Sequence, residues 1–220
     1  MKPQCVIQST ADGSPTIYLP QLDEHYHSIK GAVTESRYIY RDCALRHRAR
    51  QDHDRPLRVL EVGFGTGLNA AVSAECKDIY VHYIAFELYP LGPDISQRLG
   101  YDLPLIEAVN RAAWDIPVNI TETFTLEKRQ ADFMTADLPH DIDIVYYDAF
   151  APEKQPDIWE KGTLQRTVDV MAPGGVLTTY CAKGSIRRML TELGLKVERL
   201  PGPPGGKREI LRATKPYTQS

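Results

Sequence analysis

The stretch from Val59 to Asn69 reads Val-Leu-Glu-Val-Gly-Phe-Gly-Thr-Gly-Leu-Asn. Apolar residues lead into three glycines at alternate positions, Gly63, Gly65 and Gly67. An apolar run before a glycine-rich turn indicates a buried parallel strand, and the small residues at positions 68–74 are compatible with a helix start. A strand, a glycine loop and a helix form a unit that binds nucleotide-like ligands, because glycines let the backbone approach the ligand and the helix start leaves N–H donors free.

The spacing of the glycines bears on the ligand. A dinucleotide-binding loop has the pattern G-x-G-x-x-G/A, whose third small residue would fall on Leu68. Glu61 stands two residues before Gly63, where its charge would repel a pyrophosphate and attract an ammonium group. S-adenosylmethionine has an ammonium and a sulfonium but no phosphate. The loop therefore favours S-adenosylmethionine over NAD or FAD, with a tight turn in another kind of α/β protein as the alternative.

A second acid, Glu87, ends the apolar run 83–86 and follows Gly67 by 20 residues. A carboxylate at the tip of the second strand can accept hydrogen bonds from both ribose hydroxyls. Taken alone, Glu87 is more typical of a helix N-cap or an exposed loop acid. Its pairing with the glycine loop favours the ribose interpretation.

The composition bounds the class of protein. The 220 residues are 42% hydrophobic and 25% charged, which is typical of a globular chain with one domain and a small extension. No apolar run approaches the ~18 residues of a membrane span, and the first residues lack the apolar region of a signal peptide, so we expect no membrane and a cytoplasmic location. The formal net charge of −3 means that a nucleic acid would be bound by a local basic patch.

The cysteines and histidines give no metal pattern. The four cysteines are far apart and form no C-x-x-C pair, which argues against a zinc site and against a disulfide framework. His25 and His27 have no third ligand at a useful spacing, so we expect no metal.

The N-terminal part begins with two β-prone runs, 4–9 and 15–19, joined by the hairpin signal Asp12-Gly13. Seven arginines follow between positions 37 and 58. They fit a solvated helix face or a patch that contacts phosphate. We divide the chain into an N-terminal hairpin and helical extension, 1–55, and a Rossmann-like domain, 56–220.

The remaining pattern alternates between strands and helices. Leu103–Trp114 has helical spacing, Ile116–Gln130 is rich in strand-forming residues, and Ile142–Tyr147 is a continuous apolar strand. The sequence after these segments predicts helices at 163–171 and 185–193 and strands at 176–180, 195–200 and 207–213. A closing antiparallel pair gives a mixed sheet, so we predict an α/β protein with the Rossmann-like fold of class I S-adenosylmethionine-dependent methyltransferases.

Two acids follow predicted strands. Asp132 can accept a hydrogen bond from the adenine amino group while Phe133 packs on the ring, although a plain loop acid fits the spacing nearly as well. Asp148 ends the strand 142–147 at its carboxyl end, which faces the ligand crevice of such a sheet, so we expect it beside the reactive centre.

Several motifs in combination resemble the methyltransferase half of the MnmC family. They are Glu61–Asn69, Tyr147-Asp-Ala-Phe-Ala-Pro152, Gln155-Pro-Asp-Ile-Trp159, Pro173-Gly-Gly175 and Gly206-Lys-Arg-Glu209, and Glu35-Ser36-Arg37 resembles the family's N-terminal segment. The resemblance covers roughly residues 20–213. It implies methylation of 5-aminomethyl-2-thiouridine at the tRNA wobble position. Bifunctional members carry a flavin-dependent oxidase for which 220 residues leave no room, so we expect a separate oxidase or modification enzyme to supply the aminomethyl group.

The resemblance and the pattern together give the candidate site. Asp148 would hydrogen-bond the attacking amine, aim its lone pair and stabilise the developing charge. The candidate cofactor-binding residues are Ser36, Glu61, Gly63, Phe64, Gly65, Gly67, Asn69, Glu87, Asp132 and Phe133. The candidate substrate-binding residues are Phe150, Tyr180, Lys183, Lys207 and Arg208, of which the basic ones favour a phosphate-bearing substrate.

Other interpretations stay open. The chain is alternatively a class I methyltransferase for another amine, including a small molecule, or a non-catalytic nucleic-acid-binding relative of the fold. The set of Glu61, the glycines, Glu87 and Asp148 argues against the non-catalytic alternative. Cys181 invites comparison with the nucleophile of pyrimidine carbon methyltransferases, but no Pro-Cys pair is present there, and a small buried thiol explains it better.

Overall fold

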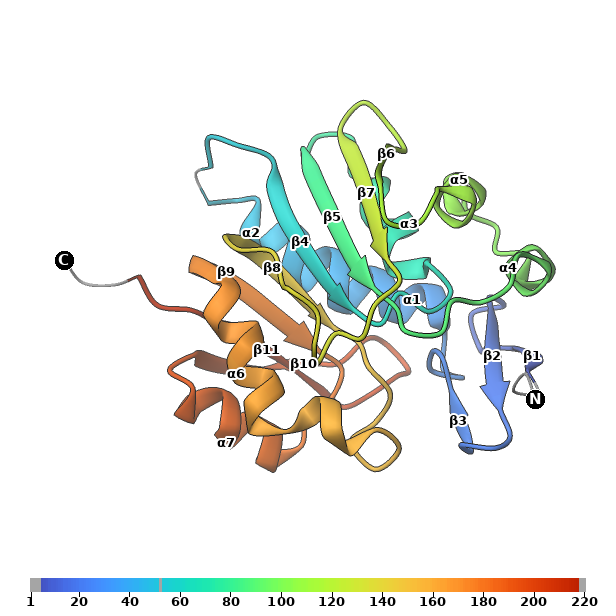
Figure 1. Ribbon diagram of the computed structural model, residues 1–220. Helices are drawn as coiled ribbons and strands as arrows, with labels where there is room; N and C mark the ends of the chain where they lie inside the picture. The colour runs from blue at the N-terminus through green and yellow to red at the C-terminus, as the bar shows by residue number, and fades with distance from the viewer. Residues whose placement is uncertain (1–4, 52, 218–220) are drawn as a thin grey trace.

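The computed structural model describes residues 5–51 and 53–217, and it is built around one eight-stranded sheet. The strand order is β10-β11-β9-β8-β4-β5-β7-β6 (Figure 1). From one edge to the other these strands are β10 (Lys196–Pro201), β11 (Glu209–Thr214), β9 (Met171–Thr179), β8 (Ile142–Tyr147), β4 (Leu57–Val62), β5 (Val81–Phe86), β7 (Phe124–Arg129) and β6 (Pro117–Asn119).

The sheet is mixed, as predicted. Strands β9, β8, β4, β5 and β7 are parallel, whereas β11 runs antiparallel to β9 and β10, and β6 runs antiparallel to β7. The first long strand, β4, lies in the middle between β5 and β8. At such a point the strand order reverses, and ligands bind in the crevice beyond the carboxyl ends. The glycine loop, Glu87 and Asp148 follow β4, β5 and β8 and therefore meet at this crevice.

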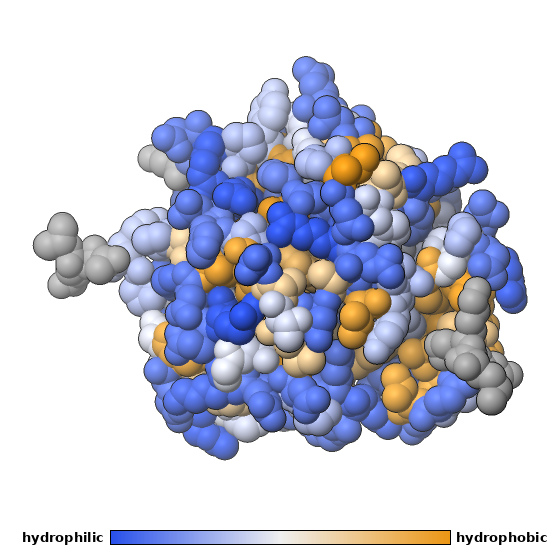
Figure 2. All heavy atoms as spheres, viewed as in Figure 1, coloured by the Kyte–Doolittle hydropathy of each residue, from blue (hydrophilic) through white to orange (hydrophobic). Residues whose placement is uncertain are grey.

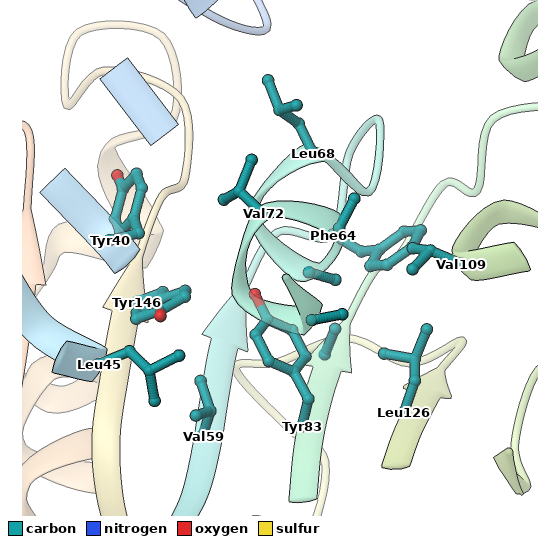
Figure 3. Packing of buried hydrophobic residues seen from close by; sticks show 14 of the residues in the cluster. Tyr40, Leu45, Val59, Phe64, Leu68, Val72, Tyr83, Val109, Leu126 and Tyr146 are labelled. Atoms are coloured by element: carbon teal, nitrogen blue, oxygen red, sulfur yellow. The ribbon is translucent and has the colours of Figure 1, made fainter. Parts of the chain in front are cut away.

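The central strands are buried on both faces, which explains why their sequences are mostly apolar, with Glu61 in β4 and Asp143 in β8 as buried acids. Neighbouring residues pack into different clusters: Val59 and Tyr146 face one side, Leu60 and Tyr147 the other. Helices α6 (Lys161–Val170) and α7 (Gly184–Glu192) contribute Leu164 and Leu190 to the second side. Helix α3 (Leu68–Ala74) belongs to the first side, where Tyr83 and Tyr146 lie between the strands and the helices (Figure 3).

One long helical segment covers the first side of the sheet. It consists of α1 (Ala32–Ser36), a π-helical stretch η1 (Arg37–Leu45) and α2 (Arg46–Arg48), and η1 contacts β8, β9 and β11. Tyr40 and Leu45 of this segment face Tyr146 and Val59 of the sheet (Figure 3). The segment is bonded to both ends of β8, to Asp148 at the carboxyl end and to Asp143 at the start.

Several of the N-terminal arginines are held in ion pairs. Arg48 and Arg55 both donate to the buried carboxylate of Asp143, at 3.1 and 2.6 Å, and Arg37 and Arg41 bind Glu75. The guanidinium groups of Arg37, Arg41 and Arg48 therefore hold the helical segment to the rest of the fold, a role that neither the solvated-face nor the phosphate-patch interpretation included.

The predicted N-terminal hairpin is confirmed and has a third strand. Strands β1 (Val6–Ser9), β2 (Pro15–Leu19) and β3 (Glu24–His25) form a separate antiparallel sheet in that order. The Asp12 carboxylate accepts from the backbone N–H groups of Ser14 and Thr34, which joins the hairpin turn to the start of α1. Figure 2 shows hydrophilic residues over most of the visible face and hydrophobic ones gathered near this small sheet. The predicted division of the chain at residue 55 stays a prediction.

Some predicted bounds were wrong. The strand expected over 116–130 is a hairpin of β6 and β7, because Thr121 and Thr123 form a turn in which Ile120 donates back to Phe124. The helix expected over 103–114 is only α5 (Ile106–Arg111).

Two further elements complete the description. A short helix not predicted from the sequence, α4 (Pro93–Leu99), follows the loop that begins at Tyr89. Strand β9 begins at Met171, and a 3-10 helix, η2 (Pro156–Trp159), precedes α6.

Candidate active site

Two cavities meet at the carboxyl ends of β4, β5 and β8. The larger has a volume of about 870 Å³ and is lined by the glycine loop, Glu87 and Asp132. The smaller has a volume of about 240 Å³ and is lined by Glu35, Tyr180 and Lys207. The residues shared by both are Tyr26, His27, Asp148, Ala149 and Phe150. Asp148 therefore stands at the boundary between a cavity of cofactor size and a second, smaller one.

The glycine loop has a backbone that larger residues would strain. Gly65 has a φ of +52°, and a Cβ at this position would lie 3.1 Å from Cδ1 of Tyr26. Gly67 has a φ of +76°, and its Cβ would lie 2.8 Å from the ring of Phe64. Gly63, Phe64 and Gly65 line the larger cavity, whereas Gly67 packs behind the loop. The predicted loop residues thus divide into those that face a ligand and one that keeps the turn tight.

Glu87 ties the end of β5 to the glycine loop. Its Oε2 accepts from the backbone N–H of Gly65 at 3.0 Å, and its Oε1 accepts from the N–H of Tyr89 at 2.9 Å. Each carboxylate oxygen has a further lone pair. Because Glu87 also lines the larger cavity, those lone pairs face a space for a ligand, and the contact with ribose hydroxyls stays a prediction.

Asp132 and Phe133 form another part of the lining of the larger cavity. The Asp132 carboxylate accepts from the N–H of Met134 at 2.9 Å. The ring of Phe133 is buried and meets Phe86 edge-on at 5.6 Å. The two residues are thereby held in place, in an arrangement compatible with the predicted adenine contacts.

Asn69 is the hub of a hydrogen-bond network that the sequence does not reveal. Ser36 Oγ donates to its Oδ1 at 2.6 Å, and its Nδ2 donates to Glu61 Oε1 at 2.9 Å and to Asp148 Oδ2 at 2.7 Å. Asn69 lines the larger cavity, whereas Ser36 and Glu61 lie behind it and line neither cavity. Of these three predicted cofactor residues, only Asn69 lines a cavity. Ser36 and Glu61 are hydrogen-bonded to the Asn69 amide and are placed to orient it.

The two carboxyl groups bonded to Asn69 both have raised pKa values. Burial raises the pKa of Glu61 well above its ordinary range, the Asn69 hydrogen bond opposes the shift, and the charge of Asp148 adds to it. Burial raises the pKa of Asp148 to about 7, against hydrogen bonds from Tyr40 and Asn69 and with the charge of Glu35 adding to the shift. Tyr40 donates to Asp148 Oδ1 at 2.5 Å. A carboxyl group with a pKa near neutrality can accept or release a proton at working pH.

The smaller cavity brings together three of the predicted substrate residues. Phe150, Tyr180 and Lys207 line it, and Lys207 Nζ lies 4.7 Å from the centre of the Tyr180 ring. Lys207 Nζ also lies 3.0 Å from Glu35 Oε2. Lys183 and Arg208 line neither cavity; Lys183 is paired with Glu153, and Arg208 is exposed.

Three site residues from the N-terminal segment were not predicted: His27, Glu35 and Tyr40. Burial lowers the pKa of His27 to about 4, with the charge of Lys207 adding to the shift, and His27 Nε2 lies 2.8 Å from Thr66 Oγ1 in the glycine loop. Glu35 belongs to the Glu-Ser-Arg motif, which is a signal for it, and Tyr40 follows Glu35 by one wide helical turn of five residues. His27 had no signal beyond its place in the chain.

Lys128 contacts both the glycine loop, at Phe64, and the end of α5. This lysine is almost fully buried, and its ammonium donates to the carbonyl oxygens of Val109 and Asn110 at 3.1 and 2.9 Å. It also lies 5.2 Å from the ring centre of Phe64 and 4.8 Å from that of Trp114. Burial lowers the pKa of Lys128 to about 8. One cation therefore joins the end of α5 to the aromatic residue of the glycine loop.

Replacing Lys128 with Met should weaken both the fold and cofactor binding. The carbonyls of Val109 and Asn110 lose their donor, at a cost of about 1–3 kcal/mol, which corresponds to a fall in Tm of roughly 2–10 °C. The freed Phe64 ring should also raise the Kd for S-adenosylmethionine. Melting curves and calorimetry measure the two effects. Lys196→Met, at an exposed position of β10, is the control, and a Lys128→Met protein with the control's Tm and Kd would contradict the role.

Among the residues that the structure describes, no helix is long and apolar enough to cross a membrane. In the same ranges, 5–51 and 53–217, no group of three or more His, Cys, Asp and Glu side chains is arranged to hold a metal ion.

Comparison with known proteins agrees with this geometry. A family model described as S-adenosyl-L-methionine-dependent methyltransferase matches residues 117–216. The tRNA 5-methylaminomethyl-2-thiouridine biosynthesis bifunctional protein MnmC of Ralstonia nicotianae is 28% identical over 95% of this chain and 34% of its own length. The MnmC protein of Paracidovorax citrulli is 29% identical over 92% of this chain and also 34% of its own length. The chain thus spans about a third of these relatives.

Solved structures show the same relationship. The crystal structure of MnmC2 from Aquifex aeolicus has a TM-score of 0.77 and 26% identity over all of this chain and 73% of that one. Spermidine synthase from Thermotoga maritima, with a TM-score of 0.58 and 13% identity over 96% of this chain and 72% of that one, shares the fold alone. By sequence and by structure, the chain is similar to the MnmC proteins, and it has the architecture of S-adenosyl-L-methionine-dependent methyltransferases.

Proposed function

We propose that this protein transfers a methyl group from S-adenosylmethionine to the primary amine of 5-aminomethyl-2-thiouridine at the wobble position of tRNA. The observation that carries the proposal is the place of Asp148, which lines both the larger and the smaller cavity. The larger cavity would hold the methyl donor and the smaller one the aminomethyl base. The amine and the methyl group would then meet beside a carboxylate. The names of the MnmC relatives support the choice of substrate.

The larger cavity fits the methyl donor. Its volume of about 870 Å³ lies within the usual range for ligand sites. Gly63 and Gly65 offer backbone without side chains, Glu87 has acceptors for ribose hydroxyls, and Asp132 with Phe133 would hold the adenine. Asn69 would contact the donor directly, and Glu61 and Ser36 would fix the orientation of its amide. Bound there, S-adenosylmethionine supplies an electrophilic methyl group.

Asp148 is proposed to prepare the amine. An alkylammonium has no lone pair, so it must lose a proton before it can attack. The Asp148 carboxylate would accept that proton at Oδ1 or Oδ2, and its pKa of about 7 suits this exchange near neutral pH. The hydrogen bonds from Tyr40 and Asn69 fix the direction of the carboxylate and so the direction of the amine lone pair. Alignment of the amine with the methyl group is the main task of such a site.

Methyl transfer to defined RNAs tests the function. Purified protein would be incubated with labelled S-adenosylmethionine and anticodon stem-loops carrying either 5-aminomethyl-2-thiouridine or unmodified uridine at the wobble position. We expect label only in the first RNA, recovered as 5-methylaminomethyl-2-thiouridine by nucleoside mass spectrometry. Transfer to free small-molecule amines, with none to RNA, would instead support the alternative of a methyltransferase for another amine-bearing substrate.

The proposed reaction needs a supply of the primary amine. We propose that a separate oxidase or modification enzyme produces the aminomethyl group before this protein acts. A tRNA substrate also suits a cytoplasmic site of action. Loss of the protein from its host should accordingly leave the aminomethyl nucleoside, rather than an earlier precursor, as the accumulating species.

Lys183 and Arg208 are proposed to contact tRNA phosphates. They are exposed and stand close in sequence to Tyr180 and Lys207, which line the smaller cavity. Changing both to Ala should weaken tRNA binding and reduce the salt dependence of log Kd by about one per lost phosphate contact, with cofactor affinity unchanged. Binding titrations over a salt series measure this, and the double variant Lys77→Ala with Arg111→Ala is the control. If log Kd depends on salt in the same way for this variant and for the control, Lys183 and Arg208 do not contact tRNA phosphates.

A further inference from the structure

The smaller cavity holds an acceptor and a donor side by side. Glu35 Oε2 and Lys207 Nζ are 3.0 Å apart, and both residues line the cavity. The pair joins the helix α1 to the loop between β10 and β11, so two distant segments place these opposite charges on one wall. The pair lies next to Asp148 closely enough for both charges to act on that carboxyl group.

The pair keeps bonding capacity for a ligand. Glu35 Oε1 accepts from the N–H of Ser28 at 3.3 Å, and Oε2 accepts from Lys207. Each carboxylate oxygen has a second lone pair, and an ammonium group has three N–H donors. Glu35 can therefore accept another hydrogen bond while Lys207 donates another.

The remaining wall suits a flat ring. Tyr26, Phe150 and Tyr180 all line the cavity, and the first two rings meet edge-on at 5.2 Å. The cavity volume is about 240 Å³, and a cavity of about 150 Å³ is enough for benzene. One six-membered ring with a short substituent therefore fits here.

We propose that Glu35 and Lys207 read the pairing edge of the uracil ring, an inference that rests on the proposed function. Glu35 accepts from the N3–H group and Lys207 donates to the O4 oxygen. In uracil the C5 aminomethyl group is next to O4, and Asp148 lines the same cavity, so its carboxylate is available to that group. The same pair rejects cytosine, because its N3 acceptor would face the carboxylate and its N4 amino donor would face the ammonium.

A purely structural ion pair is the rival explanation. In that case Glu35 and Lys207 only hold the loop 202–206 against α1, and their loss would lower activity on every base alike. The two explanations differ in whether the effect of changing the side chain depends on the pairing edge of the base. A double-mutant cycle that changes both the side chain and the base therefore separates them.

The experiment compares three anticodon stem-loops, which carry 5-aminomethyl-2-thiouridine, its N3-methyl derivative and 5-aminomethyl-2-thiocytidine at the wobble position. For the wild-type protein we expect kcat/KM for methyl transfer to fall by about 10- to 100-fold on the N3-methyl and cytidine RNAs. Glu35→Gln keeps the shape of the side chain but adds an amide donor. It should lower transfer to uridine by about 10-fold, lower transfer to the N3-methyl RNA no further, and narrow the preference for uridine over cytidine.

Lys207→Met should likewise narrow the preference for uridine over cytidine, since it removes the donor to O4. Glu24→Gln, which changes another carboxylate of the same cavity, should keep the wild-type preference. Melting curves and cofactor titrations show that each variant is folded.

The outcomes that overturn the inference are distinct from failure of the function. Equal wild-type rates on the uridine and N3-methyl RNAs would overturn the base-edge contacts and leave the proposed function intact. Equal losses on all three RNAs in Glu35→Gln would show a structural ion pair. No transfer to any of the three RNAs, by a protein that binds the cofactor and methylates another amine, would overturn the proposed function and this inference with it.

Discussion

Asp148→Ala should lower single-turnover methyl transfer to the aminomethyl RNA by at least about 10²-fold, the size expected when one preorganised electrostatic group is lost. The affinity for S-adenosylmethionine should change little, because the glycine loop, Glu87 and Asp132 are untouched. Transfer from labelled cofactor, measured beside a melting curve, gives both quantities. If Asp148 serves only to hold Tyr40 and Asn69, the variant will melt earlier but turn over normally per folded molecule.

Asp148→Asn separates proton acceptance from orientation. Asparagine keeps the shape of the side chain and one of its two acceptor oxygens, but it accepts no proton, so we expect activity close to that of Ala. Activity close to wild type would show that orientation alone matters. The wild-type rate should fall by about tenfold per pH unit below about 7, since protonated Asp148 is no longer an acceptor. Asparagine should remove that limb of the profile.

The same carboxyl group makes stability depend on pH. Its pKa is about 7 in the folded protein against an ordinary value of 3.8, so the folded state binds the proton more tightly. Its contribution to stability is therefore full below pH 3.8 and is lost as the pH rises through 7. The Tm of Asp148→Asn should gain on that of the wild type as the pH rises through this window. Parallel Tm values at pH 5 and pH 8, roughly one to two units either side of the folded-state pKa, would contradict the shift.

Gly65→Val should raise the Kd for S-adenosylmethionine by at least about 10²-fold, to the point where calorimetry shows no binding. A β-branched residue at a φ of +52° is strained by about 1–3 kcal/mol. Its Cβ would also lie 3.1 Å from Cδ1 of Tyr26, so Tyr26 or the loop must move by a few tenths of an ångström, beside the bond from the Gly65 N–H to Glu87. All three residues line the larger cavity, so the strain falls on the wall proposed to hold the cofactor.

A matched glycine is the control for this effect. Gly162 in α6 has open space around it and an ordinary φ, so Gly162→Val should bind the cofactor as the wild type does. Titrations run with a chelator present also show whether binding needs a metal ion. Undiminished binding by a folded Gly65→Val protein would show that the cofactor does not bind at this loop.

The parts that the sequence predicts well depend on local chemistry. Strands β4 and β8 are mostly apolar because both faces of the sheet are covered. Strand β4 ends at Val62, directly before the glycine loop as predicted, and β8 has the predicted bounds Ile142–Tyr147. The glycine loop also depends on local chemistry, because three of its five residues have positive φ values, which glycine adopts more readily than any other residue. Glu87 and Asp148 each follow a parallel strand, so the topology of the sheet alone predicts that both lie at one crevice.

The parts that escaped prediction depend on tertiary contacts. Glu61 stands in the expected motif, but its side chain points under α3 and meets Asn69 rather than the cavity. Lys128 lies in a strand of mixed polarity, where a lysine is expected in solvent, yet it is buried beneath Phe64. Tyr40 reaches Asp148 across more than a hundred residues of sequence, a contact that the topology permits but no local pattern encodes.

The two ties between the helical segment and β8 carry a consequence for evolution. Tyr40 and Arg48 are eight positions apart and bond to Asp148 and Asp143, at opposite ends of one strand. An inserted or deleted residue between Tyr40 and Arg48 would rotate one of these side chains away from its aspartate. Among related sequences, insertions and deletions should therefore be rare in 37–48 and more common in turns such as 11–14. A substitution of Asp143 should occur together with one of Arg48, because the loss of Asp143 alone leaves the buried guanidinium of Arg48 without its partner.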